Sequence, residues 1–423
     1  MANLENLLKR RYAPLVNVVA PEKSLAKDIP FRKEYKTGED YRFPIRFGLE
    51  QGITRANTHT ASDLNPAADA IREVASLTGS EIAGTAEFSY GQMSTLSATK
   101  GDSDEAYDQA VGTKILDLSD ALSQHLDMDL LYGCGTSGLT NIGVVNAVPV
   151  ASVGGVVTIN LTRASFIRGF WTDALGVKLD AYTAGGVKVN TTTVLTVTGV
   201  DAARCRVQLT GLQAETNAIF ATDVLHFVGS RTQSMIGIQP ILENSTTMFG
   251  INAALRPGWK AVSYAVGGAL NFDKVMEGLS AVADNGNTEG VTLYVTPAQW
   301  TDLMTDEAAL RRHLGDEGNG KVKTGYQELE FFGPCGTVTI KTYRYLKQGI
   351  AIALPKSGVH RIGSTDITFS LPGSRGNEFF YQELPTKLGA SIRGYTDQAV
   401  VLEQPFHAAI FTGVASTADA VPA

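Results

Sequence analysis

The sequence predicts an α+β protein in which a long helix, a small all-β module and a mixed α/β body follow one another along the chain. Residues 102–132 carry apolar side chains at helical spacing. Residues 144–238 are rich in Val, Thr and Gly and break into short runs, which is typical of strands joined by tight turns. Residues 239–388 mix helical and strand patterns. With 423 residues, 43% of them hydrophobic and 19% charged, the chain has enough apolar material for a core.

Two segments that lack a core of their own precede the long helix. Residues 1–28 are polar, and such a segment cannot bury enough surface to offset its ordering entropy, so we expect an arm that lies on something else. Residues 29–100 are predicted to form an extended excursion. Within it, Tyr41–Phe47 alternates apolar residues with Arg and predicts a strand, Pro66–Leu77 predicts a short helix, and Ala86–Ala98 predicts the returning strand.

The helix over 102–132 is the clearest predicted element. Asp102 and Glu105 form a capping-box pattern at its start. Its apolar residues fall three or four apart on one face: Val111, Ile115, Leu118, Leu122, Leu126 and Leu130. We expect Gly133 to end the helix as its C′ residue. About 30 residues at 1.5 Å each give a rod of about 45 Å, which is long for a globular protein.

The mixed body and the end of the chain contain further helix and strand patterns. The predicted helices are Asn271–Val282, Pro297–Met304 and Asp306–Leu314. The predicted strands are Gly290–Val295 and Gly336–Tyr343, and the stretch Ser391–Val414 is expected to close the fold with strands.

Charge is unevenly distributed along the chain. Through Arg55 there are 11 Lys and Arg against 7 Asp and Glu, or +4, whereas the remainder has 25 against 36, or −11. The basic residues of the front part are Lys9, Arg10, Arg11, Lys23, Lys27, Arg32, Lys33, Lys36, Arg42 and Arg46. They suit either the phosphates of a polyanion such as DNA or the acidic face of a neighbouring subunit, and a simply solvated arm remains an alternative.

Cysteine usage and hydropathy exclude several classes of protein. Cys134, Cys205 and Cys335 are far apart and odd in number, which argues against a disulfide framework or a zinc site and favours a reducing compartment. The sequence contains no run of 18 apolar residues, so no membrane span is predicted. Lys9, Arg10 and Arg11 interrupt the first apolar stripe, so we expect no secretory leader.

No catalytic, cofactor-binding or metal site is predicted. Gly133–Gly138 matches GxGxxG, but a helix precedes it where a nucleotide site requires a strand. Cys134 would need a base, and the six histidines form no Cys/His signature. The carboxylates of Asp102, Asp104 and Glu105 suit a helix N-terminus better than a cation loop. The stretches 284–287 and 316–320 are predicted to be exposed loops.

The order of these parts resembles the Hong Kong 97-like fold of tailed-bacteriophage major capsid proteins. The stretches that carry the resemblance are Gly138–Gly143, Met235–Leu242, Arg256–Lys260, Val295–Trp300, Phe332–Gly336, Arg393–Tyr395 and Leu402–Gly413. The resemblance implies an N-terminal arm (1–28), an extended loop (29–100), a peripheral domain with its spine helix (101–143 and 389–415), an axial domain (239–388) and a tail (416–423). The all-β module (144–238) is then an insertion between spine helix and axial domain.

The resemblance implies a structural protein with no enzymatic activity and no cofactor. It implies pentamers and hexamers that form an icosahedral head around double-stranded DNA, located in the virion and assembled in the cytoplasm of a bacterial host. The implied partners are other copies, portal and scaffolding proteins, a decoration protein, and DNA through non-specific contacts, with no membrane. The lysine, asparagine and glutamate of the crosslink known in some family members cannot be matched here. An encapsulin-type nanocompartment shell or a tail-tube protein is the alternative, and a cysteine hydrolase acting through Cys134 is a third hypothesis.

Overall fold

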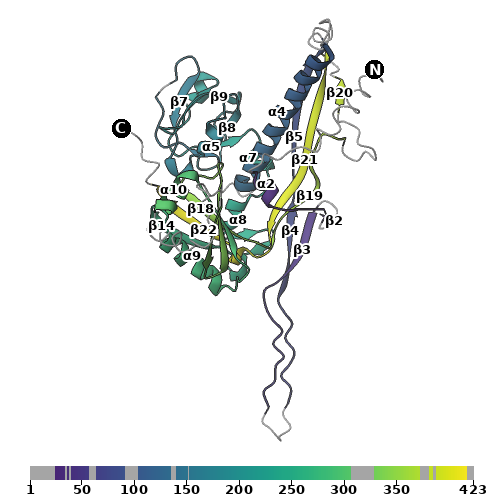
Figure 1. Ribbon diagram of the computed structural model, residues 1–423, viewed down its shortest axis with the longest axis vertical. Helices are drawn as coiled ribbons and strands as arrows, with labels where there is room; N and C mark the ends of the chain where they lie inside the picture. The colour runs from purple at the N-terminus through teal and green to yellow at the C-terminus, as the bar shows by residue number, and fades with distance from the viewer. Residues whose placement is uncertain are drawn as a thin grey trace, which may run out of the picture.

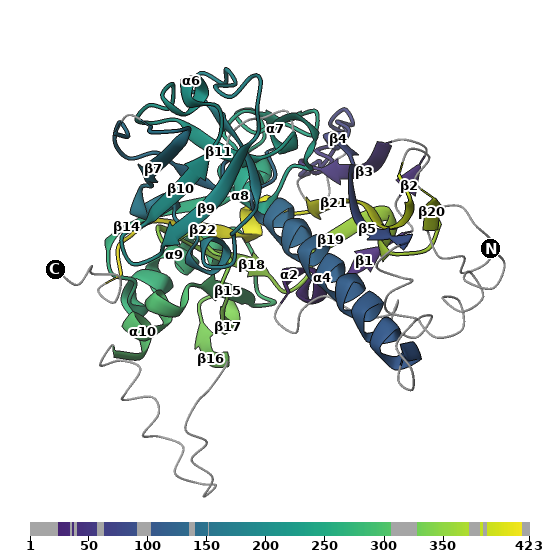
Figure 2. The same ribbon diagram turned by 90° about the horizontal axis from the view of Figure 1, so that it is seen from above.

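A long helix, a two-part body and a projecting hairpin make up the molecule (Figure 1). The computed structural model describes residues 24–33, 36–37, 40–56, 63–90, 103–134, 140–150, 152–305, 328–371, 381–383 and 387–416. Helix α4 (Ser103–Tyr132) lies along a sheet of long strands on one side of the molecule, and the body lies on the other side of the helix (Figure 2).

The sheet beside α4 has five strands. They are β1 (Phe31–Arg32), β19 (Val359–Thr368), β21 (Gly389–Leu402), β20 (Tyr381–Glu383) and β5 (Ser80–Ser89). The order is β1-β19-β21-β20, and β5 also pairs with β21 over ten residues. The predicted helix over 102–132 is confirmed, and Ile115, Leu122, Leu126 and Leu130 of its predicted apolar face are buried. A Cβ at Gly394 of β21 would lie 2.3 Å from Leu122 Cδ1, so this glycine lets helix and sheet approach closely.

The predicted end of the helix at Gly133 is confirmed. Helix α4 does end at Tyr132, and the Gly133 N–H donates to Asp129 O at 2.9 Å, but Gly133 has no positive φ. A Cβ here would lie 2.3 Å from Met235 O and 2.5 Å from Asp129 O. Glycine is therefore needed because two backbone segments meet at this point. Residue 102, the predicted cap, lies outside the described residues.

The β module is a six-stranded antiparallel sheet. Its order is β6 (Gly143–Val144), β11 (Val224–Phe227), β8 (Lys178–Tyr182), β9 (Leu195–Asp201), β10 (Arg206–Thr210) and β7 (Val156–Asn160). A bridge between Val145 and Leu161 joins the two outer strands, so the sheet closes on itself. Short helices α5 (Arg168–Trp171), α6 (Gln213–Thr216) and α7 (Ser230–Gln233) and the 3-10 turn Arg163–Ser165 complete the module. Strands are thus confirmed in the Val-, Thr- and Gly-rich stretch.

The rest of the body is built on a mixed six-stranded sheet. Its order is β14 (Val262–Gly268), β22 (Ala409–Val414), β18 (Ile350–Pro355), β15 (Val291–Val295), β17 (Gly336–Thr342) and β16 (Glu328–Gly333). Helices α9 (Phe272–Asp284) and α10 (Pro297–Thr305) confirm two predicted helices, and Asn271 caps α9 by accepting from Lys274 N at 3.0 Å. The third predicted helix, Asp306–Leu314, lies outside the described residues. Smaller elements are α8 (Ile238–Leu242), β12 (Thr247–Met248), β13 (Ile251–Asn252) and the 3-10 turns Pro257–Trp259 and Pro405–His407.

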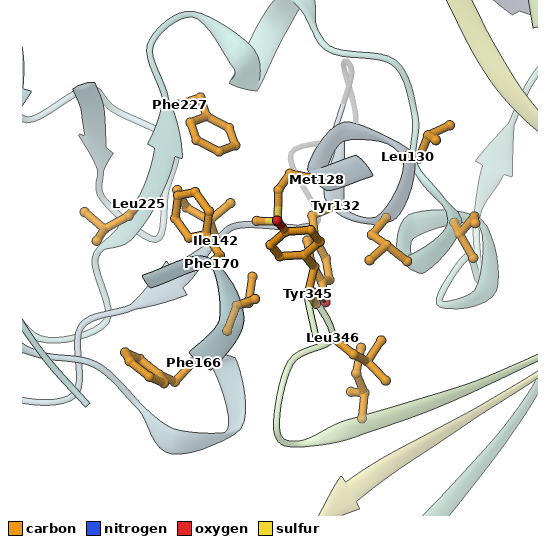
Figure 3. Packing of buried hydrophobic residues seen from close by; sticks show 14 of the residues in the cluster. Met128, Leu130, Tyr132, Ile142, Phe166, Phe170, Leu225, Phe227, Tyr345 and Leu346 are labelled. Carbon is orange, nitrogen blue, oxygen red and sulfur yellow. Dashed lines mark hydrogen bonds between the residues drawn. The ribbon is translucent and has the colours of Figure 1, made fainter. Parts of the chain in front are cut away.

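The last turns of α4 join the β module to the mixed sheet in one hydrophobic core (Figure 3). Met128 and Tyr132 of α4 lie between Leu225 and Phe227 of β11 and the loop that carries Tyr345 and Leu346, whereas Leu130 points to the opposite side of the helix. The Tyr132 hydroxyl donates to Tyr345 O at 2.8 Å and accepts from Lys347 N at 2.8 Å. Helix, module and body are therefore held together by buried contacts.

The hairpin differs from prediction in its second strand. It consists of β2 (Lys36–Thr37), β3 (Asp40–Arg46) and β4 (Arg72–Thr78), which form a three-stranded sheet. The short helix predicted over Pro66–Leu77 is wrong, because Arg72–Thr78 pairs with β3 and buries alternate side chains, Ala75 and Leu77, against the body. The returning strand is thus β4, whereas β5 belongs to the sheet beside α4. Residues 91–98 of the strand predicted over Ala86–Ala98 lie outside the described residues.

The end of the predicted arm is fastened to the body. Helix α2 (Leu25–Asp28) buries Leu25 and Ala26 against α4. The buried carboxylate of Asp127 accepts from Ser24 Oγ at 2.8 Å, from Ala26 N at 3.1 Å and from Tyr343 OH at 2.8 Å. The last five residues of the predicted arm, 24–28, therefore belong to the folded body.

Candidate assembly surfaces

The hairpin projects far from the body in Figure 1. Its two sides stay paired beyond the strands: Phe47 N donates to Ile71 O at 2.8 Å and Gln51 N to Ala68 O at 3.1 Å. Farther out, Asn65 Nδ2 donates to Ile53 O at 2.8 Å. From residue 40 to residue 56 an extended chain rises about 3.3 Å per residue, which gives a reach of about 55 Å.

Large apolar side chains are exposed along the outer part of the hairpin. Leu49, Ile53 and Leu64 are 64%, 71% and 85% exposed. Val74 and Ile71, closer to the body, are also exposed. A two-stranded hairpin without a packed face is marginal in water, so this apolar surface is available to a partner. We refer to residues 48–56 and 63–70 as the hairpin tip.

An aromatic cluster holds the base of the hairpin against the body, and we call its residues, Phe43, Phe47, Phe249 and Trp259, the hairpin seat. Trp259 is buried, its ring centroid lies 6.4 Å from that of Phe43 and 6.3 Å from that of Phe47, and its Nε1 donates to Met248 O at 3.1 Å. The ring centroid of Phe249 also lies 6.5 Å from that of Trp259, and Phe249 has a φ of 54°, a conformation that costs energy in a bulky residue.

Two polar contacts reinforce this seat. The Phe249 carbonyl accepts from Ser76 N of β4 at 3.0 Å, and Arg256 pairs with Glu73 at 2.6 Å. The hairpin therefore leaves the body in a defined direction. The sequence patterns did not predict this cluster. The sequence feature that could have indicated it is the dipeptide Phe249–Gly250, which turns the chain between β12 and β13.

The structure describes only some of the basic residues that were expected to face a polyanion. Lys9, Arg10, Arg11 and Lys23 lie outside the described residues. Arg42 and Arg46 are exposed on one face of β3, and Arg42 forms an exposed ion pair with Asp40 at 3.1 Å. An exposed pair of this kind contributes little to stability, so these arginines remain able to contact other charges.

Cys134 lies near a histidine, and both groups are held in their neutral forms. Its Sγ is 3.9 Å from His226 Nδ1 and 3.2 Å from Arg231 O, and both side chains are buried. Burial raises the pKa of the Cys134 thiol, and burial together with the charge of Arg231 lowers the pKa of His226 to about 4. A thiolate–imidazolium pair requires the opposite shifts, so both groups are neutral at pH 7.

The structure describes some of the other candidate residues. No group of three His, Cys, Asp or Glu side chains in the described part of the chain is placed to hold a metal ion. Asp102 lies outside the described residues, and nothing is described of the side chains of Asp104 and Glu105. The loop at 284–287 is exposed only in part, because Asn287 is buried and donates to His407 O at 3.2 Å. Residues 316–320 are not described.

A groove of about 320 Å³ lies between the β module and the mixed sheet. It is bounded by Arg168 and Thr172 on one side and by Pro297 and Leu346 on the other. Its walls are mostly apolar, and its lining residues provide no nucleophile with a neighbouring base. None of the helices within the described ranges is long and apolar enough to cross a membrane.

The sequence matches no protein-family model and no curated protein. Comparison with solved structures finds similar chains. One is in the capsid asymmetric unit of cyanophage A-1(L), with 13% identity, 94% of each chain covered and a TM-score of 0.47. Another is from Mycobacterium phage Bobi, with 12% identity, 98% of each chain and a TM-score of 0.43. A third is the capsid of cyanophage P-SCSP1u, with 10% identity, 98% of this chain, 95% of that chain and a TM-score of 0.41. All three are phage structures, and two of them are capsids by name.

Proposed function

We propose that this chain is the major capsid protein of a tailed bacteriophage, a shell subunit whose copies associate into pentamers and hexamers and enclose double-stranded DNA. The observation that carries the proposal is the hairpin, an extended segment with an exposed apolar tip on a rigid aromatic seat. Such a segment gains stability when it lies on another molecule, and in a shell every copy has neighbours of the same kind.

Each part of the molecule has a role in this proposal. The hairpin tip lies over a neighbouring subunit in the same shell. The mixed sheet, with residues 239–388, surrounds the axis of each pentamer or hexamer, and the chain before residue 24 ties these units together. The function is binding without catalysis, in which many modest interfaces add up to a closed particle.

The proposal extends to partners and location. A portal protein, a scaffolding protein and a decoration protein are expected partners, and packaged DNA is contacted through its phosphates by exposed arginines such as Arg42 and Arg46. The protein is then a virion component that assembles in the cytoplasm of a bacterial host.

Negative-stain microscopy of the purified full-length chain tests the proposal. Closed icosahedral particles are expected. A deletion of residues 1–23, which spares the buried Leu25 and Ala26, is expected to fold and to give fewer or irregular particles. Compact monomers of the full-length chain at all concentrations contradict the proposal. Particles of normal number and shape from the truncated chain contradict the role of the arm.

A further inference from the structure

A buried lysine lies where helix α8 packs against the end of α4. Lys347 is 5% exposed, and its Nζ donates to Gln239 Oε1 of α8 at 3.0 Å. The same Nζ lies 4.4 Å from the centroid of the Tyr132 ring at the end of α4. Lysine is almost never fully buried unless its charge is paired, so this position is unusual.

The surroundings of Lys347 favour the neutral amine over the ammonium ion. An ammonium group has three N–H donors, and the described residues give it one oxygen acceptor, Gln239 Oε1, beside the face of an aromatic ring. Burial lowers the pKa of Lys347 to about 8, although the charge of Glu243 opposes this shift. A neutral amine carries a free electron pair on Nζ and is therefore a nucleophile.

The side-chain amide of Gln239 is an electrophile within reach of this amine. Because an amide C=O bond is about 1.23 Å long, Gln239 Cδ lies at most about 4.2 Å from Lys347 Nζ. The torsion that turns the amide has a broad energy minimum, so a small rotation brings Cδ to the distance of about 3–3.5 Å from which such atoms react. Both residues are held in place, since Lys347 N donates to Tyr132 OH at 2.8 Å and Gln239 is 7% exposed. Groups held in this way reach effective molarities of about 10⁵–10⁸ M.

A carboxylate contacts the nitrogen that would leave the amide. Gln239 Nε2 donates to Glu243 Oε1 at 2.7 Å, one helical turn farther along the chain. Glu243 is exposed, so it connects the buried amide with solvent. An amide nitrogen leaves after it has gained a proton, and a carboxyl group within hydrogen-bond distance can deliver that proton. An amine, an electrophile and a proton carrier thus meet at one point.

We propose that Lys347 and Gln239 of the same chain join in an isopeptide bond. Lys347 Nζ attacks Gln239 Cδ, the bond between Cδ and Nε2 breaks, and Nε2 leaves as ammonia. One proton of the attacking amine passes to Nε2 through Glu243, which ends in its original state. The reaction occurs once per chain and consumes no other reactant. The bond ties α8 to the loop before β18 across 108 positions of the sequence, and it forms independently of the proposed shell function.

The mass of the full-length chain tests the bond. Purified protein that is incubated at pH 8 and then denatured is expected to weigh about 17 Da less than its sequence, because one ammonia is lost. Digestion is expected to give a branched peptide in which residue 239 is joined to residue 347. A folded chain that keeps the mass of its sequence overturns the proposal, as does a loss of ammonia that maps to any other residue.

Two variants separate the reaction from folding. Lys347→Met removes the amine and is expected to keep the mass of its sequence. Glu243→Gln changes an exposed side chain, so it is expected to keep its circular dichroism spectrum and to form the bond at least tenfold more slowly. Glu50→Gln, which changes another exposed glutamate, is the matched control and is expected to react like the wild type. Loss of ammonia from Lys347→Met overturns the bond, and bond formation at the wild-type rate in Glu243→Gln overturns the role of Glu243.

Discussion

Removing the apolar side chains of the hairpin tip is expected to abolish assembly without unfolding the subunit. The variant is Leu49→Ser/Ile53→Ser/Leu64→Ser. Fully burying a leucine or isoleucine stabilises by about 1.5–3 kcal/mol. Since these side chains are 64–85% exposed, about 1–2.5 kcal/mol each remains available to a neighbour. Three side chains give about 3–7 kcal/mol per copy, or about 10²- to 10⁵-fold in the association constant at 1.4 kcal/mol per tenfold.

Two measurements separate assembly from folding. Light scattering against protein concentration is expected to show the threshold for particle formation rising at least a hundredfold for the triple variant. Its melting temperature below that threshold is expected to fall by no more than a few degrees, because exposed substitutions usually change stability by at most about 0.5 kcal/mol each. The variant Glu50→Ser/Gln51→Ser, on the same exposed stretch, removes no apolar side chain and is expected to assemble normally. A triple variant that forms particles at the wild-type concentration refutes the reasoning.

Three further substitutions test the hairpin seat, the end of α4 and the pH dependence. Trp259→Ala is expected to cost about 3–5 kcal/mol in unfolding free energy and to speed amide exchange in residues 40–46 and 72–78, whereas unchanged exchange argues against the seat. Gly133→Ala is expected to cost about 1–3 kcal/mol, because its Cβ would meet Met235 O, and a melting curve identical to wild type contradicts this. The depressed pKa of His226 favours its neutral form in the folded state, so stability is expected to be lost as pH falls from about 6.5 to about 4. In the variant His226→Gln this loss of stability on acidification is expected to be smaller, as measured by chemical denaturation at a series of pH values. An unchanged pH dependence of stability shows that other groups cause the loss.

Elements with strong local patterns were predictable from the sequence. The 30-residue helix α4 was predicted because its apolar residues repeat at helical spacing, and the helix predicted over Asn271–Val282 corresponds to α9. The segment Pro66–Leu77 misled the prediction because its composition suits a helix, whereas the strand Arg72–Thr78 is imposed by pairing with β3 and by the burial of Ala75 and Leu77. Tertiary contacts decide the structure of such a segment.

Contacts between residues that are far apart in the sequence could not be predicted from local patterns. Ser24 donates a hydrogen bond to Asp127, which is 103 positions away in the sequence. Ala26, in a segment predicted to be a polar arm, is buried. Cys134 and His226 are 92 residues apart, so their proximity follows only from the closure of the β module on the end of α4. The sequence indicated assembly, not catalysis, as the expected function, but the exposed apolar tip of the hairpin could be recognised only from the exposure of each side chain in the folded chain.

The positions of β21 and β22 affect when the subunit becomes competent to associate. Strand β21 pairs with β5, β19 and β20, and β22 lies between β14 and β18, so both sheets receive an interior strand from residues 389–414. Val401 and Ala399 of β21 also line the seat of the hairpin. A nascent chain that has left the ribosome only as far as residue 388 has both sheets incomplete and the hairpin unsupported. Under the proposed function, ordered contact between subunits would therefore require translation past Val414, and the unpaired strand edges of shorter nascent chains would need protection from aggregation.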